Sequence, residues 1–198
     1  MPRVLGLPAS PPIPPAVALS DELSALLQPR IARLGYLGAF FAVSARQPEA
    51  LAGFVRFTEA LKDAVPEGLG EVVALRVATA LDNAYEKAQH EALVRTRGIP
   101  KGWIAAASGG NDESGALNAD ELIVRNLTDV VLANTGHAAS DVMALAVDRF
   151  GPDLVVGIVL LISRFIAHAY AANAFALVDP RPGDGGSQPV FHPNEETT

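Results

Sequence analysis

Apolar residues recur every three or four positions through most of this chain, in segments that Pro, Gly or Asn separate. One segment follows Ser20 and ends at Gly35, and another begins at Pro48 and ends before Pro66. Such spacing places the apolar side chains on one face of a helix, with Ser and Pro favoured at helix starts and Gly at helix ends. Abundant Ala and Leu with 6% aromatic residues also favour packed helices over a β-sandwich. The sequence therefore predicts an all-α protein.

The length of 198 residues suits a single domain with one main core. We expect a proline-rich N-terminal arm over 1–16, a helical domain over 17–178 and a disordered C-terminal tail over 179–198. Six prolines in the arm disfavour a helix and favour extended chain, and such arms often lie on a neighbouring subunit.

One apolar run, Leu154–Ile162, is about half of the ~20 residues that a membrane span needs. Arg164 and His168 follow it. We therefore expect a buried core or interface helix here and no contact with a membrane. The N-terminus has no apolar segment of the kind found in signal peptides, so we expect a cytoplasmic protein.

A formal charge of −7 and a pI near 5.0, with no basic run, argue against nucleic acid as a partner. The chain contains no cysteine, which excludes disulfides, thiolate metal sites and thiol-dependent peroxidase chemistry. No motif requires a metal or another cofactor, and we expect none.

Residues 71–97 form either one long helix or two. Asn83 followed by Glu86 resembles a helix-capping pair, which slightly favours a second helix that begins at Asn83 and closes at Gly98.

Glu86 and His90 are four residues apart, and this spacing places them on one helix face. A carboxylate against an imidazole, in surroundings that exclude water, can orient and tune a proton donor. The alternative is an exposed ion pair that adds a few tenths of a kcal/mol to the helix. Glu71 favours the functional interpretation. If the helix is continuous, Glu71, Glu86 and His90 all fall within about one third of its circumference. If it breaks at Asn83, a helical hairpin can still bring the three residues together.

The order Glu71, Arg76-Val-Ala, Asn83-Ala-Tyr-Glu-Lys-Ala-Gln-His-Glu-Ala and Arg-Gly-Ile-Pro resembles the core of the carboxymuconolactone decarboxylase family, within the alkylhydroperoxidase (AhpD)-like superfamily. The resemblance is tightest over residues 66–105. It implies an AhpD-like helical bundle that assembles as a trimer or as a hexamer of trimers. The apolar final helix and the proline-rich arm also favour self-association, because each presents surface that a monomer would leave uncovered.

In the peroxidase branch, the resemblance implies a Cys-x-x-Cys, a following His and an upstream Glu in a proton relay. The two cysteines fall at Asn83 and Glu86, the His at His90 and the Glu at Glu71. The decarboxylase branch has Glu in place of the second Cys, as here, but Lys87 stands where an aromatic residue is usual. The resemblance is thus to a cysteine-free branch.

The predicted catalytic residues are Glu71, Glu86 and His90, in a cofactor-free lyase that acts on a small carboxylated lactone or unsaturated acid. In this hypothesis His90 delivers a proton to the carbon that loses carbon dioxide, Glu86 orients the imidazole, and Glu71 completes the relay. The alternatives are a non-catalytic helical oligomer that keeps the fold, and a hydratase or isomerase that uses the same residues.

Other polar residues have structural interpretations beside functional ones. Arg164 and His168 suit a core or interface but can also reach a shared cleft. Arg76 suits an ion pair more than a grip on a substrate carboxylate, and Tyr85 and Trp103 suit packing.

Overall fold

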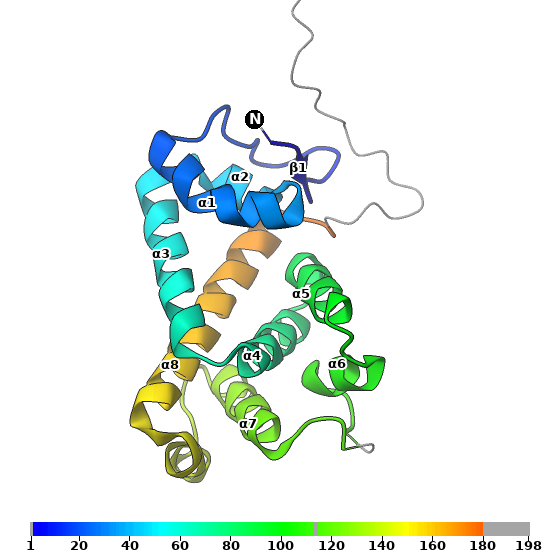
Figure 1. Cartoon of the computed structure of the whole chain (residues 1–198), viewed down its shortest axis with the longest axis vertical. Coiled ribbons are helices and arrows are strands. Elements are labelled where there is room, and N and C mark those ends of the chain that lie inside the picture. The colour runs from blue at the N-terminus through cyan, green and yellow to red at the C-terminus, as the bar shows by residue number, and fades with distance from the viewer. Residues whose placement is uncertain (1, 113–114, 180–198) are drawn as a thin grey trace, which may run out of the picture. The chain divides into compact units, whose positions relative to one another are not determined.

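The computed structural model of the protein describes residues 2–112 and 115–179 (Figure 1). The described chain is helical apart from one pair of two-residue strands, so the predicted all-α class is confirmed. The elements are, in order, β1 (Val4–Leu5), α1 (Asp21–Leu34), β2 (Leu37–Gly38), α2 (Ala39–Ser44), α3 (Pro48–Ala64), α4 (Glu67–Ala80), α5 (Ala84–Thr96), α6 (Lys101–Ala107), α7 (Ala119–Ala133) and α8 (Ser140–Ala174).

The described residues form two compact units, 2–57 with 171–179, and 58–112 with 115–170. In the first unit β1 pairs in parallel with β2, and the Ala16 amide donates to the Ala42 carbonyl at 2.8 Å. The proline-rich segment therefore packs against its own chain. The predicted domain boundaries stay predictions, and most of the predicted disordered tail, from residue 180 onward, lies outside the described residues.

The predicted start and end residues of the first helices are confirmed. The Ser20 side chain accepts from the Leu23 amide at the start of α1. Gly35 ends this helix with a φ of 76°, a left-handed conformation that glycine adopts without a steric cost. Pro48 is the first residue of α3.

The second unit is built around α4, whose residues are mostly apolar and buried and which contacts α5, α6 and α7. A largely apolar helix has to be covered by its neighbours. Its most buried side chains are Val72, Val73, Ala74, Leu75 and Val77, each with 0% exposure. They form one core with residues of α6, α7 and α8.

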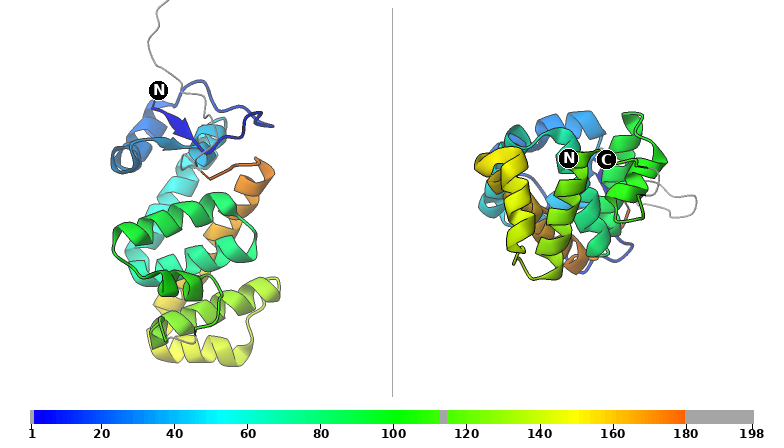
Figure 2. Two further views of the ribbon diagram at one scale, coloured as in Figure 1. Left: turned by 90° about the vertical axis from the view of Figure 1, so that its right-hand side faces the viewer. Right: turned by 90° about the horizontal axis from the view of Figure 1, so that it is seen from below.

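Two helices follow one another as a hairpin, since α4 ends at Ala80 and α5 begins at Ala84 (Figure 2). The predicted break is confirmed, because the Asn83 side chain accepts from the Glu86 amide at 2.9 Å and caps α5. The Asn83 amide group also donates to the Ala169 carbonyl at 3.1 Å. Asn83 thus starts α5 and ties that start to α8.

The last helix, α8, is interrupted at Gly151, where φ is 76° and ψ is 161°. Two helical segments therefore meet in a kink at Gly151, and the second ends at Ala174. By length and composition α8 could cross a membrane, with a mean hydropathy of 2.0 over its most apolar window. Half of that window is buried within the structure, as in core helices.

We expect Asn83→Ala to lower the free energy of unfolding by about 1–3 kcal/mol, because it removes a helix cap and the buried hydrogen bond to the Ala169 carbonyl. Urea unfolding monitored by circular dichroism measures this change. Asn118→Ala is the matched control, since the Asn118 side chain caps the exposed start of α7 by accepting from the Asp120 and Glu121 amides of the same helix. Equal losses in the two variants would contradict a tertiary role for Asn83.

Candidate acid/base site

A carboxylate, Glu71, lies in the first half of the buried helix α4 and is only 8% exposed. An ionised carboxyl group in apolar surroundings needs a cationic or hydrogen-bonding partner. Its Oε2 atom lies 2.7 Å from Nδ1 of His90 on α5, and its Oε1 atom lies 3.8 Å from Nη1 of Arg97.

The three predicted site residues come together. Glu86 and His90 lie one turn apart on α5, and His90 Nε2 is 3.7 Å from Glu86 Oε2. Both ring nitrogens of His90 therefore face carboxylates. The closer carboxylate is Glu71 of the neighbouring helix, whereas the sequence analysis gave the orienting role to Glu86. The i,i+4 rule places two residues on one face but says nothing of the interval between helices.

A second pair of residues converges on Glu86 from α8. His168 Nδ1 is 3.0 Å and Arg164 Nη1 is 3.7 Å from Glu86 Oε2. Arg164 is 5% exposed, and its Nε donates to Thr58 Oγ1 at 3.1 Å. The core placement suggested for Arg164 and His168 is thus combined with contact to a site residue. The signal in the sequence was their four-residue spacing within an apolar helix.

These contacts shift the pKa values of the buried groups in opposite directions. Burial lowers the pKa of His90, but Glu71 and then Glu86 outweigh burial and raise it from 6.5 to about 9. Burial lowers the pKa of His168 from 6.5 to about 4, a change that Glu86 opposes and Arg164 and His90 reinforce. Burial raises the pKa of Glu86, but His168 and His90 outweigh burial and hold it well below 4.5.

At neutral pH, therefore, His90 is an imidazolium ion and His168 a neutral imidazole. The cluster of Glu71, Glu86, His90 and Arg164 then holds two negative and two positive charges. Apolar surface flanks it, since the Phe165 ring meets the His90 ring edge-on with centroids 5.3 Å apart. The arrangement can keep a proton donor loaded in a site where little water competes.

The remaining candidates have structural roles. Arg76 forms an ion pair with Asp129 of α7, in agreement with the favoured interpretation. Tyr85 and Trp103 are 1% and 8% exposed and pack in the interior. Within residues 2–112 and 115–179, no group of three or more His, Asp or Glu side chains is placed to hold a metal ion together.

A hollow of about 290 Å³ lies between α5 and α6, and none of the acid/base residues lines it. The mutually contacting titratable groups Glu71, Glu86, His90 and His168 lie at the cluster and not at this hollow. The α5 residues Lys87 and Glu91 line the hollow, and each directly follows a cluster residue, Glu86 or His90, in the sequence.

Neither a protein-family model nor the sequence of a curated protein matches the chain. Several solved structures, in contrast, match its fold. An uncharacterized peroxidase-related protein from Ralstonia eutropha JMP134, described as an alkylhydroperoxidase AhpD core, superposes with a TM-score of 0.70 at 15% identity, over 87% of this chain and 91% of that one. A peroxidase-related protein from Silicibacter sp. TM1040 gives 0.70 at 17% identity, over 88% and 91%.

The debrominase Bmp8, solved as an alanine variant in complex with 2,3,4-tribromopyrrole, gives a TM-score of 0.69 at 14% identity, over 85% of this chain and 91% of that one. At these identities the similarity concerns the fold. The expected bundle is confirmed: this chain has the AhpD-like helical fold, in a form without cysteine.

Proposed function

We propose that this protein is a cofactor-free lyase that decarboxylates a small carboxylated lactone or unsaturated acid, with His90 as the general acid. The observation that carries the proposal is the position of His90 between two carboxylates, Nδ1 at 2.7 Å from Glu71 and Nε2 at 3.7 Å from Glu86. The His90 side chain is 19% exposed, so a ligand can reach it, whereas that of Glu86 is 5% exposed.

The Nε2 proton is the one available for transfer. The Nδ1 proton is engaged in a short hydrogen bond to Glu71, while 3.7 Å from Nε2 to Glu86 is too long for one. The nearer contact of Glu86 Oε2 is with His168 Nδ1, at 3.0 Å. A substrate at Nε2 therefore does not have to displace a strong internal bond.

In the proposed reaction, the bond between the substrate carbon and its carboxylate breaks, carbon dioxide leaves, and the electron pair stays on that carbon. His90 transfers its Nε2 proton to the carbon, which gives a neutral imidazole. A proton from water restores the imidazolium ion for the next turnover. Glu71 holds the ring by Nδ1 throughout, and Glu86 favours the charged form.

A second candidate is an isomerase that moves a proton within the substrate. The observation that favours it is His168, a neutral imidazole whose Nδ1 lies 3.0 Å from the carboxylate that also faces His90. One acid and one base would then share Glu86. Incorporation of solvent deuterium without release of carbon dioxide distinguishes this activity from decarboxylation.

We expect His90→Ala to reduce kcat/KM on the acid that the wild type decarboxylates by about 10²–10⁴-fold, because a positioned acid contributes about that much. Glu71→Gln should also lower kcat, since the neutral amide no longer stabilises the imidazolium ion. The double variant should be little worse than His90→Ala alone, because the two residues act as one unit. Carbon dioxide release from a panel of carboxylated lactones and unsaturated acids is the assay.

His137→Ala is the control for loss of a histidine, since His137 lies exposed beyond α7. Circular dichroism checks that each variant is folded. Full turnover by folded His90→Ala would rule out the proposed mechanism. A wild type inactive on every acid of the panel would favour the non-catalytic oligomer.

Nuclear magnetic resonance of ¹⁵N-labelled histidine should show opposite behaviour of the two buried rings. We expect His90 to stay protonated until the pH rises through about 9, and His168 to stay neutral until the pH falls through about 4. The rate of the wild type should accordingly fall as the pH rises through about 9, where the acid loses its proton. Glu71→Gln should lower the pKa of His90 and leave that of His168 nearly unchanged. Titration of both rings near 6.5 would contradict this assignment.

We also propose self-association as a trimer or a hexamer, inside the cell and without a membrane. Support comes from apolar side chains that α8 leaves exposed: Val156 at 58%, Leu160 at 42% and Tyr170 at 61%. Light scattering should give a trimeric or hexameric mass, and Leu160→Asp should lower it. A monomer at micromolar concentration would contradict the proposal.

A further inference from the structure

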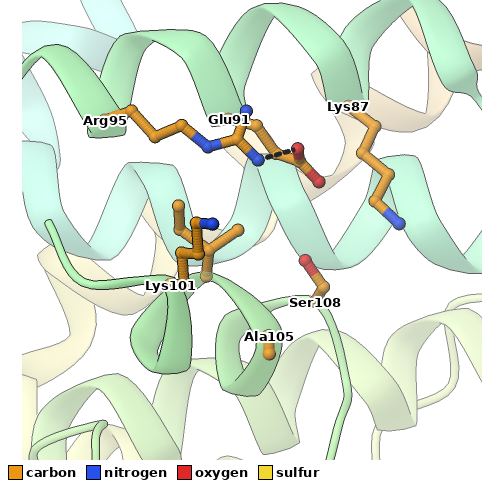
Figure 3. A pocket seen from close by; sticks show the side chains of 7 residues that line it. Lys87, Glu91, Arg95, Lys101, Ala105 and Ser108 are labelled. Carbon is orange, nitrogen blue, oxygen red and sulfur yellow. Dashed lines mark hydrogen bonds and ion pairs between the residues drawn. The ribbon is translucent and has the colours of Figure 1, made fainter.

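The hollow between α5 and α6 has basic walls in an acidic protein (Figure 3). It measures about 290 Å³. Helix α5 contributes Lys87, Glu91 and Arg95, and α6 with its C-terminal cap contributes Lys101, Ile104, Ala105 and Ser108. Such a volume suits a small molecule rather than a peptide.

The positive charge of the hollow is not cancelled internally. Arg95 Nη2 donates to Glu91 Oε2 at 2.6 Å, so these two charges offset one another. Among residues 2–112 and 115–179, neither Lys87 nor Lys101 forms an ion pair. The chain has only three lysines, and these are two of them. The third, Lys62, bonds to Glu59 at 2.9 Å, away from the hollow.

A buried hydroxyl group adds a second, independent observation. Ser108 Oγ is buried and has no hydrogen-bond partner within the described structure, although the Ser108 carbonyl accepts from Arg76 Nη1 at 3.4 Å. An unpaired buried hydroxyl costs about 1–3 kcal/mol, which an acceptor on a ligand would recover. Figure 3 shows the Ser108 side chain directed into the hollow, on the side from which Lys87 enters.

The floor is apolar. Ile104 and Ala105 of α6 line the space together with the charged groups. Inorganic phosphate has no hydrocarbon part that could cover Ile104 and Ala105. A ligand with an anionic group and a hydrocarbon body satisfies the lysines, the hydroxyl group and the floor together.

We propose that this hollow is a binding site for a small organic carboxylate, separate from the acid/base cluster. The ligand carboxylate accepts hydrogen bonds from Lys87 Nζ and Ser108 Oγ, Lys101 supplies further positive charge, and the hydrocarbon body covers Ile104 and Ala105. Lys87 and Glu91 each follow a cluster residue by one position, which turns them about 100° around α5 from Glu86 and His90. The two sites therefore use different faces of one helix, and binding here does not depend on the proposed lyase activity.

The scarcity of lysine makes the test direct. Reductive methylation with ¹³C-formaldehyde gives one dimethyl resonance per lysine and keeps each positive charge, and Lys→Arg variants assign the resonances. Titration with benzoate should move the Lys87 and Lys101 resonances along one saturable curve and leave that of Lys62 in place. Movement of all three without saturation, or of none, would overturn the proposal.

Calorimetry on the unmodified protein measures affinity. Lys87→Gln and Ser108→Ala should each weaken benzoate binding, on the order of tenfold, because each removes a hydrogen bond to a charged group. Lys62→Gln is the matched control and should bind as the wild type does.

Two further probes test the class of ligand. Acetate, which lacks the larger apolar body, should bind more weakly than benzoate, and so should inorganic phosphate. Phosphate that binds as tightly as benzoate would overturn the assignment to an organic carboxylate. Unchanged affinity for benzoate in Lys87→Gln would overturn the site itself.

Discussion

The second unit depends on a negative charge held in its interior, the carboxylate of Glu86. Removal of an ion from water costs several kcal/mol unless partners surround it, and here the partners come from two helices. Arg164 and His168 approach from α8 and His90 from α5 itself. Because Asn83 also joins the start of α5 to Ala169, the carboxylate and its partners are positioned by the same contact between α5 and α8. Loss of one partner would leave the charge of the buried Glu86 carboxylate less well compensated.

The proposed function rests on the distribution of protons rather than on any unusual residue. Two histidines within reach of one carboxylate take opposite states at neutral pH, because only His90 has a second carboxylate, Glu71, against its other nitrogen. The buried helix α4 supplies that carboxylate and the apolar surroundings at once. The AhpD-like fold in this chain thus holds a protonated imidazole between two carboxylates, in a sequence without cysteine.

Sequence reasoning succeeded where the relevant physics is local. Helix starts at Ser20, Pro48 and Asn83 follow from side chains that satisfy free amides or preset the backbone, and these rules act within a few residues. The meeting of Glu71 with the α5 pair was predicted through the hairpin. The closer approach of Glu71 to His90, and the contacts of Arg164 across the core, depend on the interval and rotation between helices, which no short pattern encodes. The basic hollow was not predicted for the same reason, since Lys87 and Lys101 lie on different helices and only the packing of α5 on α6 brings them together.

The balance of charge inside the cluster has a consequence for encounter with the proposed anionic substrate. A site whose own charges cancel projects little field into solution, so a distant anion senses mainly the protein as a whole, with its formal charge of −7. That field repels an anionic acid at long range and is screened beyond about 8 Å at physiological ionic strength. Added salt should therefore speed the arrival of such a substrate, the reverse of the behaviour of enzymes that draw their ligands in by opposite charge.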